Sequence, residues 1–119
     1  GTVFVTLADA DKEEALPLIR RFYQLGFNIE ATHGTAAFLR AHGIRTRVKA
    51  KLSEGSDEII NLLRGGFVAY VINTRETDGY IIRRAAVENN VTMFTSLDTV
   101  KVLLDVLEEI TIGVSTIDA

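Results

Sequence analysis

Short segments rich in β-forming residues alternate with segments of helical periodicity along the whole chain. In residues 11–25 the apolar positions recur at helical spacing, and Gly26 stands where the C-terminal end of a helix is expected. Residues 67–73 are nearly all apolar, which is typical of a central parallel strand covered on both faces. The pattern predicts strands over residues 2–7, 27–31, 44–48, 67–73 and 91–94, and helices over residues 11–25, 35–41, 56–64, 79–88 and 97–108.

This alternation predicts an α/β fold, namely a three-layer α/β/α sandwich around a five-stranded parallel sheet with right-handed crossovers. Ligands of such sheets bind beyond the carboxyl ends of the strands, near the point where the strand order reverses. We therefore expect a binding site in the loops that follow Leu7, Ala31, Val48 and Asn73. Residues 1–109 are expected to form one domain, and residues 110–119 a C-terminal tail that either docks on a neighbouring surface or frays.

The composition excludes several classes of protein. The 119 residues suit a single domain, and the net charge of −3 provides no overall positive field for nucleic acid or an anionic membrane. The chain has no cysteine, and therefore no disulfide, thiolate nucleophile or cysteine-based metal site. Its apolar runs are far shorter than the roughly 20 residues of a membrane-spanning helix, and we recognise no targeting segment before the first strand. We expect a cytoplasmic protein, and the absence of an initiator methionine indicates a piece of a longer one.

The segment Thr32-His33-Gly34-Thr35 joins a predicted strand to a predicted helix. It supplies hydroxyl groups, a glycine that lets a ligand approach the backbone, and the unpaired N–H groups of a helix N-terminus. These are the components of a phosphate-binding loop. An ordinary capped turn, with Thr35 as the N-cap, explains the same residues, and both interpretations stay open at this point.

Basic residues occupy every second position from residue 45 to residue 51. If this stretch is extended, their side chains point to one side of the strand. Such a row either protects an edge strand against pairing with another chain or, at its last member beside the loop, contacts an anion. The four residues are Arg45, Arg47, Lys49 and Lys51.

Asn73 and Thr74 leave the predicted central strand at its carboxyl end, and two adjacent arginines follow in the next helix. Arg83 and Arg84 lie about 100° apart around that helix, so they cannot share one role. We expect one of them to face the binding crevice, where arginine suits bidentate phosphate contact, and the other to be solvated or paired with a carboxylate.

No pattern in the sequence points to catalysis. His33 and His42 are the only histidines, and no H-E-x-x-H pattern accompanies them, so no metal site is expected. The sequence also lacks the G-x-S-x-G, Walker A and G-x-G-x-x-G motifs. We therefore predict a binding site without catalytic residues, metal or a cofactor of its own.

Four separated motifs occur in one order along the chain: Ala31-Thr32-His33-Gly34-Thr35-Ala36, Lys51 followed by Glu54-Gly55, Ile72-Asn73-Thr74, and Ile81-Ile82-Arg83-Arg84. In this combination the chain closely resembles the methylglyoxal-synthase-like domain at the carboxyl end of the carbamoyl phosphate synthetase large subunit. The resemblance covers essentially the whole sequence. It implies a five-stranded, parallel, Rossmann-like sheet in a regulatory domain that binds UMP as inhibitor and, in some members, IMP as activator.

The resemblance also implies roles for individual residues. Gly79 and Arg75 depart from the best-known bacterial pattern, which has serine and threonine there, so the identity of the effector stays open. Thr35 and Lys51 are expected on an exposed rim, where alanine substitution weakens nucleotide binding without unfolding the domain. The implied phosphate contacts are Thr6, Lys12, Thr32, Thr35, Lys51, Asn73 and Thr74; the base and ribose side has Asp78, Gly79, Ile82 and Arg83; and Thr95 borders an ornithine site.

For the parent protein, the resemblance implies synthesis of carbamoyl phosphate from bicarbonate, glutamine-derived ammonia and two ATP, with Mg or Mn, for pyrimidine and arginine synthesis. The partners of this domain would be the synthetic domains of the large subunit and the glutaminase small subunit. A chain of this size cannot hold the ATP-dependent machinery, so by itself it is expected to be inert.

Two alternatives remain at this point. One is a phosphate lyase of the methylglyoxal synthase type, which eliminates phosphate from dihydroxyacetone phosphate and needs a carboxylate base such as Asp57. The resemblance to that enzyme calls for a Gly-Gly-Asp loop and a Trp-Asp-Pro stretch, whereas this chain has Gly55-Ser56-Asp57 and Asn73-Thr74-Arg75. The other alternative is a purely structural or oligomer-forming module, which does not explain why polar residues gather at the strand ends.

Overall fold

A computed structural model describes residues 1–49, 57–75 and 79–118, with side-chain exposure described as far as residue 111. Every predicted helix and strand is present. With one exception, the ends of these elements lie within two residues of the predicted positions. In chain order the elements are β1 (Thr2–Thr6), the 3-10 turn η1 (Asp9–Asp11), α1 (Lys12–Gln24), β2 (Asn28–Ala31), α2 (His33–Ala41), β3 (Thr46–Val48), α3 (Glu58–Arg64), β4 (Val68–Asn73), α4 (Gly79–Glu88), β5 (Thr92–Phe94) and α5 (Leu97–Asp118).

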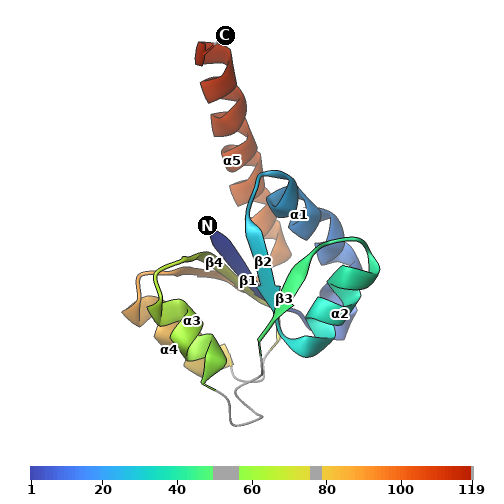
Figure 1. Ribbon diagram of the computed structural model, residues 1–119, viewed down its shortest axis with the longest axis vertical. Helices are drawn as coiled ribbons and strands as arrows, with labels where there is room; N and C mark the ends of the chain where they lie inside the picture. Colours follow the sequence, from blue (N-terminus) through green and yellow to red (C-terminus); the bar gives the residue numbers. More distant parts are fainter. Residues whose placement is uncertain (50–56, 76–78, 119) are drawn as a thin grey trace.

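The five strands form one parallel sheet in the order β3-β2-β1-β4-β5 (Figure 1). From β1 the chain moves outward through β2 to β3, and then returns to place β4 on the other side of β1. The strand order therefore reverses between β1 and β4. This is the position at which an open parallel sheet binds its ligands beyond the strand ends.

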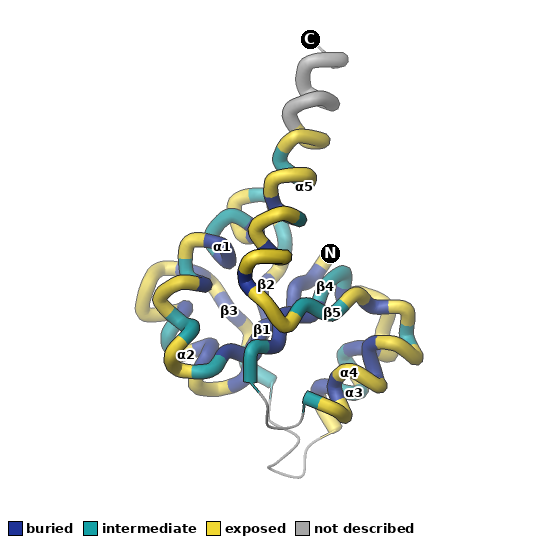
Figure 2. Tube along the Cα trace, turned by 180° about the vertical axis from the view of Figure 1, so that it is seen from behind, coloured by how far each residue is buried: buried dark blue, intermediate teal, exposed yellow. Residues whose placement is uncertain are grey.

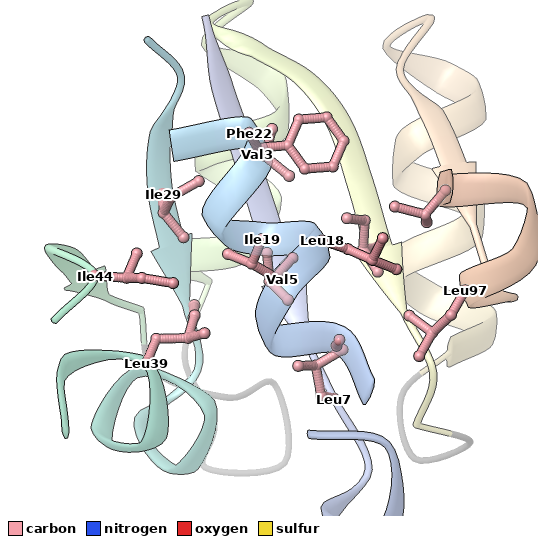
Figure 3. Close-up of a cluster of buried hydrophobic side chains, with 14 of the residues drawn as sticks. Val3, Val5, Leu7, Leu18, Ile19, Phe22, Ile29, Leu39, Ile44 and Leu97 are labelled. Carbon is pink, nitrogen blue, oxygen red and sulfur yellow. The ribbon is translucent and has the colours of Figure 1, made fainter. Parts of the chain in front are cut away.

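Helices cover both faces of the sheet, and each face has its own apolar core. Val3 and Val5 of β1 face α1, α2 and α5, where they pack with residues such as Ile19 and Phe22 (Figure 3). Phe4 points the opposite way and joins the core formed with α3 and α4. All five residues of β1 are buried, which Figure 2 marks in dark blue, and because successive side chains of a strand alternate between faces, both faces of β1 are covered. The predicted three-layer α/β/α sandwich is confirmed.

Glycines end α1 and α2 as predicted, with Gly26 at φ 97° and Gly43 at φ 82°, a backbone region that residues with a side chain rarely adopt. The start of α2 differs from the prediction, which placed it at residue 35. Thr32 has an extended backbone and its carbonyl accepts the Ala36 N–H at 2.8 Å, so the helix begins at His33. Thr32, and not Thr35, therefore occupies the N-cap position.

The predicted end of the last helix, at residue 108, is wrong, since α5 continues to Asp118 and projects beyond the body of the domain (Figure 1). No proline or turn sequence follows residue 108, and each further helical residue adds one backbone hydrogen bond at little cost. The helix is therefore continuous through residue 110, where the separate C-terminal tail was expected to begin. Within the described ranges, no helix has the length and apolar character needed to cross a bilayer.

An ion-pair cluster joins α5 to α1. Arg21 of α1 donates to Asp105 at 2.7 Å from Nη2 and also binds Glu108, both on α5. The hydrogen bonds to Glu108 and Asp105 raise the pKa of Arg21 above its ordinary value. Together with the buried Val100 and Leu104, this cluster fixes the first half of α5 against the domain.

Candidate functional site

Polar residues line the carboxyl ends of the strands on the face that α3 and α4 cover. Phe4 and Val71 are register partners, and both belong to the core on that face. Thr6 and Asn73, which come two residues later in β1 and β4, are also register partners and therefore face the same side. They meet at the point where the strand order reverses.

Each of the other three strands continues this arrangement with one residue. Thr32 follows β2 beside Thr6, and Lys49 follows β3 directly after the register pair of Ala31 with Val48. Thr95 follows β5 directly after the partner of Ile72. We call the resulting set the carboxyl-end row: Lys49, Thr32, Thr6, Asn73 and Thr95 in spatial order across the sheet.

Hydrogen bonds tie the strand ends together around this row. The hydroxyl of Thr32 donates to the hydroxyl of Thr6 at 3.3 Å, and both residues are buried. The Thr6 carbonyl accepts the Thr74 N–H at 3.1 Å, and the Thr74 hydroxyl accepts the Ala8 N–H at 2.9 Å. The structure thus brings together three of the predicted contact residues, Thr6, Thr32 and Thr74, which lie far apart in the sequence.

The N-terminus of α2 opens beside the same row. Because the Thr32 hydroxyl is directed to Thr6, it makes no capping bond to the backbone of α2. The ammonium of Lys12 lies above this helix end, 3.6 Å from the position that a Cβ on Gly34 would take, and it donates to Asp9 at 2.6 Å. The helix dipole favours an anion at this end, and Lys12, which is paired with Asp9, places a cation beside it.

Asn73 carries a buried donor without a partner. Its side chain is 2% exposed, its Oδ1 accepts the Arg75 N–H at 3.0 Å, and its Nδ2 has no hydrogen-bond partner among the described residues. This Nδ2 lies 3.5 Å from the position of a Cβ on Gly79, so glycine keeps the space beside it open. A buried donor without a bond costs about 1–3 kcal/mol, and an acceptor atom of a ligand would remove that cost.

A cavity of about 480 Å³ continues from Asn73 toward α4 and β5. Gly79 and Arg83, expected on the base and ribose side, line it together with Arg75, and so does Thr95, which was expected to border an ornithine site; Tyr80 and Met93 were not predicted as site residues. Tyr80 lies in the first turn of α4 and Met93 lies in β5, so their proximity to the ends of β4 and β5 is the signal that could have identified them. The lining consists of Asn73, Thr74, Arg75, Gly79, Tyr80, Arg83, Met93 and Thr95.

The two adjacent arginines have different roles, as predicted. Arg83 lines this cavity, whereas Arg84 pairs with Glu88 on the exposed side of α4, with 3.1 Å between Nε and Oε1. Ile82, which was expected on the base and ribose side, is 2% exposed and packs in the core under α4. It therefore supports the helix and does not line the cavity.

Residues 14–95 match the family model of the MGS-like domain. The chain belongs to this family. Over 114 aligned residues it is also 41% identical to the "Carbamoyl phosphate synthase large chain, C-terminal section" of Methanopyrus kandleri. That alignment covers 91% of this chain and 21% of the relative, so the MGS-like domain spans about a fifth of the relative's length.

A second, smaller cavity of the MGS-like domain is acidic. It has a volume of about 290 Å³ and begins at Thr95, the residue at the end of the carboxyl-end row. Three carboxylates border it, those of Asp11, Glu14 and Asp98. Thr95 thus separates a cavity lined by arginines from one that favours a cation.

Two of the predicted contact residues, Lys51 and Asp78, lie outside the described residues. Asp57, the base of the alternative lyase reaction, is exposed at the N-terminal end of α3.

The expected position of Thr35 on an exposed rim is wrong. Thr35 is 2% exposed, and its hydroxyl accepts the Leu7 N–H at 3.1 Å, joining α2 to the end of β1. Helical spacing alone cannot reveal this bond because its partners are 28 residues apart. In this MGS-like domain Thr35 supports the loop, while the exposed residues of the α2 N-terminus are His33 and Gly34.

Thr35→Val is expected to lower the free energy of unfolding by about 1–3 kcal/mol, because it leaves the buried Leu7 N–H without an acceptor. Thr35→Ser keeps the hydroxyl and serves as the matched control with a smaller loss. Urea unfolding followed by circular dichroism measures both. Equal stability of the valine variant and the wild type would contradict the structural role of this hydroxyl.

Proposed function

We propose that this MGS-like domain is the regulatory domain of a carbamoyl phosphate synthetase large chain, and that it binds a nucleoside monophosphate effector, UMP as inhibitor or IMP as activator. The name of the 41% identical relative supports the parent enzyme. The buried Nδ2 of Asn73, which has no partner in the described part of the chain and lies beside Thr6 in the carboxyl-end row, is the observation that supports an anionic ligand at this site.

In this proposal the phosphate group binds between β4 and the N-terminus of α2. Its oxygens accept hydrogen bonds from Asn73 Nδ2 and from the first backbone N–H groups of α2. Lys12 supplies a positive charge at the same helix end. Lys51, which follows β3 in the sequence, is proposed as a second cation. Thr6, Thr32, Thr35 and Thr74 hold these groups in place through the bonds described above.

The base and ribose then occupy the cavity between β4, α4 and β5. Its volume of about 480 Å³ lies within the range of about 300–1,000 Å³ that is usual for small-molecule sites. Arg75, Tyr80 and Arg83 line it with two guanidinium groups and one aromatic ring. Arginine and tyrosine planes stack on nucleobases, which supports a nucleotide over inorganic phosphate.

We also propose that ornithine binds near Thr95, between this domain and the synthetic portion of the parent. The acidic cavity with Asp11, Glu14 and Asp98 supports this assignment, since ornithine carries ammonium groups.

The parent would synthesise carbamoyl phosphate in the cytoplasm from bicarbonate, ammonia and ATP, with Mg or Mn, and the glutaminase small subunit would supply the ammonia from glutamine. The domain itself would be inert and would act on the synthetic domains, for pyrimidine and arginine synthesis. An effector does so only by binding two conformations of the parent unequally, with a coupling that is typically about 1–3 kcal/mol.

Thermal melts of the chain with UMP, IMP, inorganic phosphate and dihydroxyacetone phosphate test this function. A ligand at about 100 times its dissociation constant stabilises the native state by about 2.7 kcal/mol, which raises the melting temperature of a chain of this size by roughly 10 °C. We expect such a shift with UMP or IMP and a much smaller one with phosphate. A shift with dihydroxyacetone phosphate alone would favour the lyase, and no shift with either nucleotide would contradict the proposal.

A further inference from the structure

A buried carboxylate lies directly beneath the carboxyl-end row. Glu30 is only 6% exposed, and its position in β2 is two residues before Thr32, so both side chains are on the same face of the sheet. Its register partners are the buried Phe4 on β1 and the exposed Arg47 on β3. A carboxylate in such surroundings requires a positive partner or hydrogen bonds, because burial disfavours its charge.

Lys49 supplies the positive charge, but the pair is loose. The distance between Lys49 Nζ and Glu30 Oε1 is 3.8 Å, which is within the range of an ion pair and beyond that of a hydrogen bond. The Lys49 side chain is 30% exposed, whereas that of Glu30 is 8% exposed. Lys49 can therefore move toward another anion with little loss, while Glu30 is fixed in the sheet.

The backbone of Lys49 places this ammonium next to the proposed phosphate site. The Lys49 N–H donates to the Ala31 carbonyl at 2.8 Å, which continues the parallel pairing of β3 with β2. Lys49 thus lies beside Thr32 on the neighbouring strand, and neighbouring strands are about 4.8 Å apart. Thr6 lies one strand further along the sheet. A lysine side chain is long enough to span that spacing and reach a ligand held at Thr32.

We propose that Lys49 is a further phosphate-binding residue of this site, and that Glu30 determines its affinity by competing with the ligand for the Lys49 ammonium. This inference rests on the proposed function, because it assumes a phosphate group at the α2 N-terminus. On binding, the ammonium exchanges the carboxylate at 3.8 Å for phosphate oxygens. The negative charge of Glu30 then opposes the phosphate, so the two residues affect affinity in opposite directions.

Isothermal titration with UMP, IMP and uridine tests the proposal on the wild type and three variants. Lys49→Gln is expected to bind the nucleotide about 10-fold more weakly, because it loses one charge-assisted hydrogen bond. Glu30→Gln is expected to bind it about 5-fold more tightly, because a like charge near the ligand is removed. Binding of uridine, which has no phosphate, is expected to be the same in all of them.

Arg45→Gln is the matched control, because the exposed Arg45 also carries a positive charge just before β3 but lines a different cavity, together with Tyr23 and Asn28. It is expected to change the affinity less than 2-fold. A merely structural role of Glu30 predicts weaker or unchanged binding in Glu30→Gln, and this result would overturn the competition. If Glu30→Gln does not fold, Lys49→Gln still tests the inference, because Lys49 is partly exposed and an unchanged affinity of this variant for the nucleotide would overturn the inference.

Absence of nucleotide binding by the wild type would instead refute the proposed function, and the role of Lys49 with it.

Discussion

Phe22→Ala is expected to lower the free energy of unfolding by about 3–5 kcal/mol, the usual cost of removing a buried phenyl ring. Phe22 is fully buried between α1 and the sheet, and its ring stands edge-on to that of Phe27, with the ring centres 5.5 Å apart. Alanine would leave a cavity that the strands and α1 cannot close. Since the total stability of such domains is about 5–15 kcal/mol, the loss is a large fraction of it. Urea unfolding at 25 °C, with both fluorescence and circular dichroism as probes, measures this change.

Phe67→Ala is the matched control, because it removes the same ring from a residue that is 75% exposed. The Phe67 carbonyl that accepts the Thr2 N–H is retained. The control is expected to change stability by no more than about 0.5 kcal/mol. Similar losses in the two variants would show that the core between α1 and the sheet is not packed as described.

Asn73→Asp is expected to weaken UMP or IMP binding more than 100-fold. The new carboxylate keeps the acceptor for the Arg75 N–H but replaces the Nδ2 donor with a negative oxygen in a residue that is 2% exposed. Two like charges about 4 Å apart repel by about 4 kcal/mol at an effective dielectric constant of about 20. A 100-fold change corresponds to about 2.8 kcal/mol, so repulsion alone is sufficient. Isothermal titration calorimetry measures the affinity, and circular dichroism checks the fold.

Asn61→Asp introduces the same charge on the exposed side of α3, away from the carboxyl-end row, and is expected to leave the affinity within 2-fold of the wild type. If Asn73→Asp folds and binds the nucleotide as tightly as this control does, the phosphate group does not contact Asn73. The proposed position of the ligand would then be wrong even if the domain binds nucleotides elsewhere.

Local sequence patterns predicted most of the helices and strands, because residues close in the sequence determine where these elements form and end. Most of the apolar stretch 67–73 forms β4 (Val68–Asn73), an interior strand between β1 and β5, whereas the central strand of the sheet is β1. Gly26 and Gly43 end their helices through backbone angles that need no distant contact. Helical geometry predicted that the two adjacent arginines have different roles, and the structure shows that Arg83 lines the cavity while Arg84 pairs with Glu88.

Features that depend on strand neighbours were not predictable from one sequence. The bond from Leu7 to Thr35 and the pairing of Glu30 with Lys49 arise only when β1, β2 and β3 lie side by side. The length of α5 was missed for a different reason, since residues 109–118 contain several β-branched residues and a glycine, which have low helix propensity. Propensity is a weak guide where a well-anchored helix can extend.

The carboxyl-end row takes one residue from each strand, so the complete row spans the chain from residue 6 to residue 95. A fragment produced by proteolysis between these residues cannot contain it, and a nascent chain acquires it only when its fifth strand has been synthesised and paired. Assembly of such a site requires contacts between distant segments, which form slowly in parallel sheets. Binding of the proposed effector would therefore report on complete folding of the domain, and incomplete or cleaved chains would not compete for the ligand.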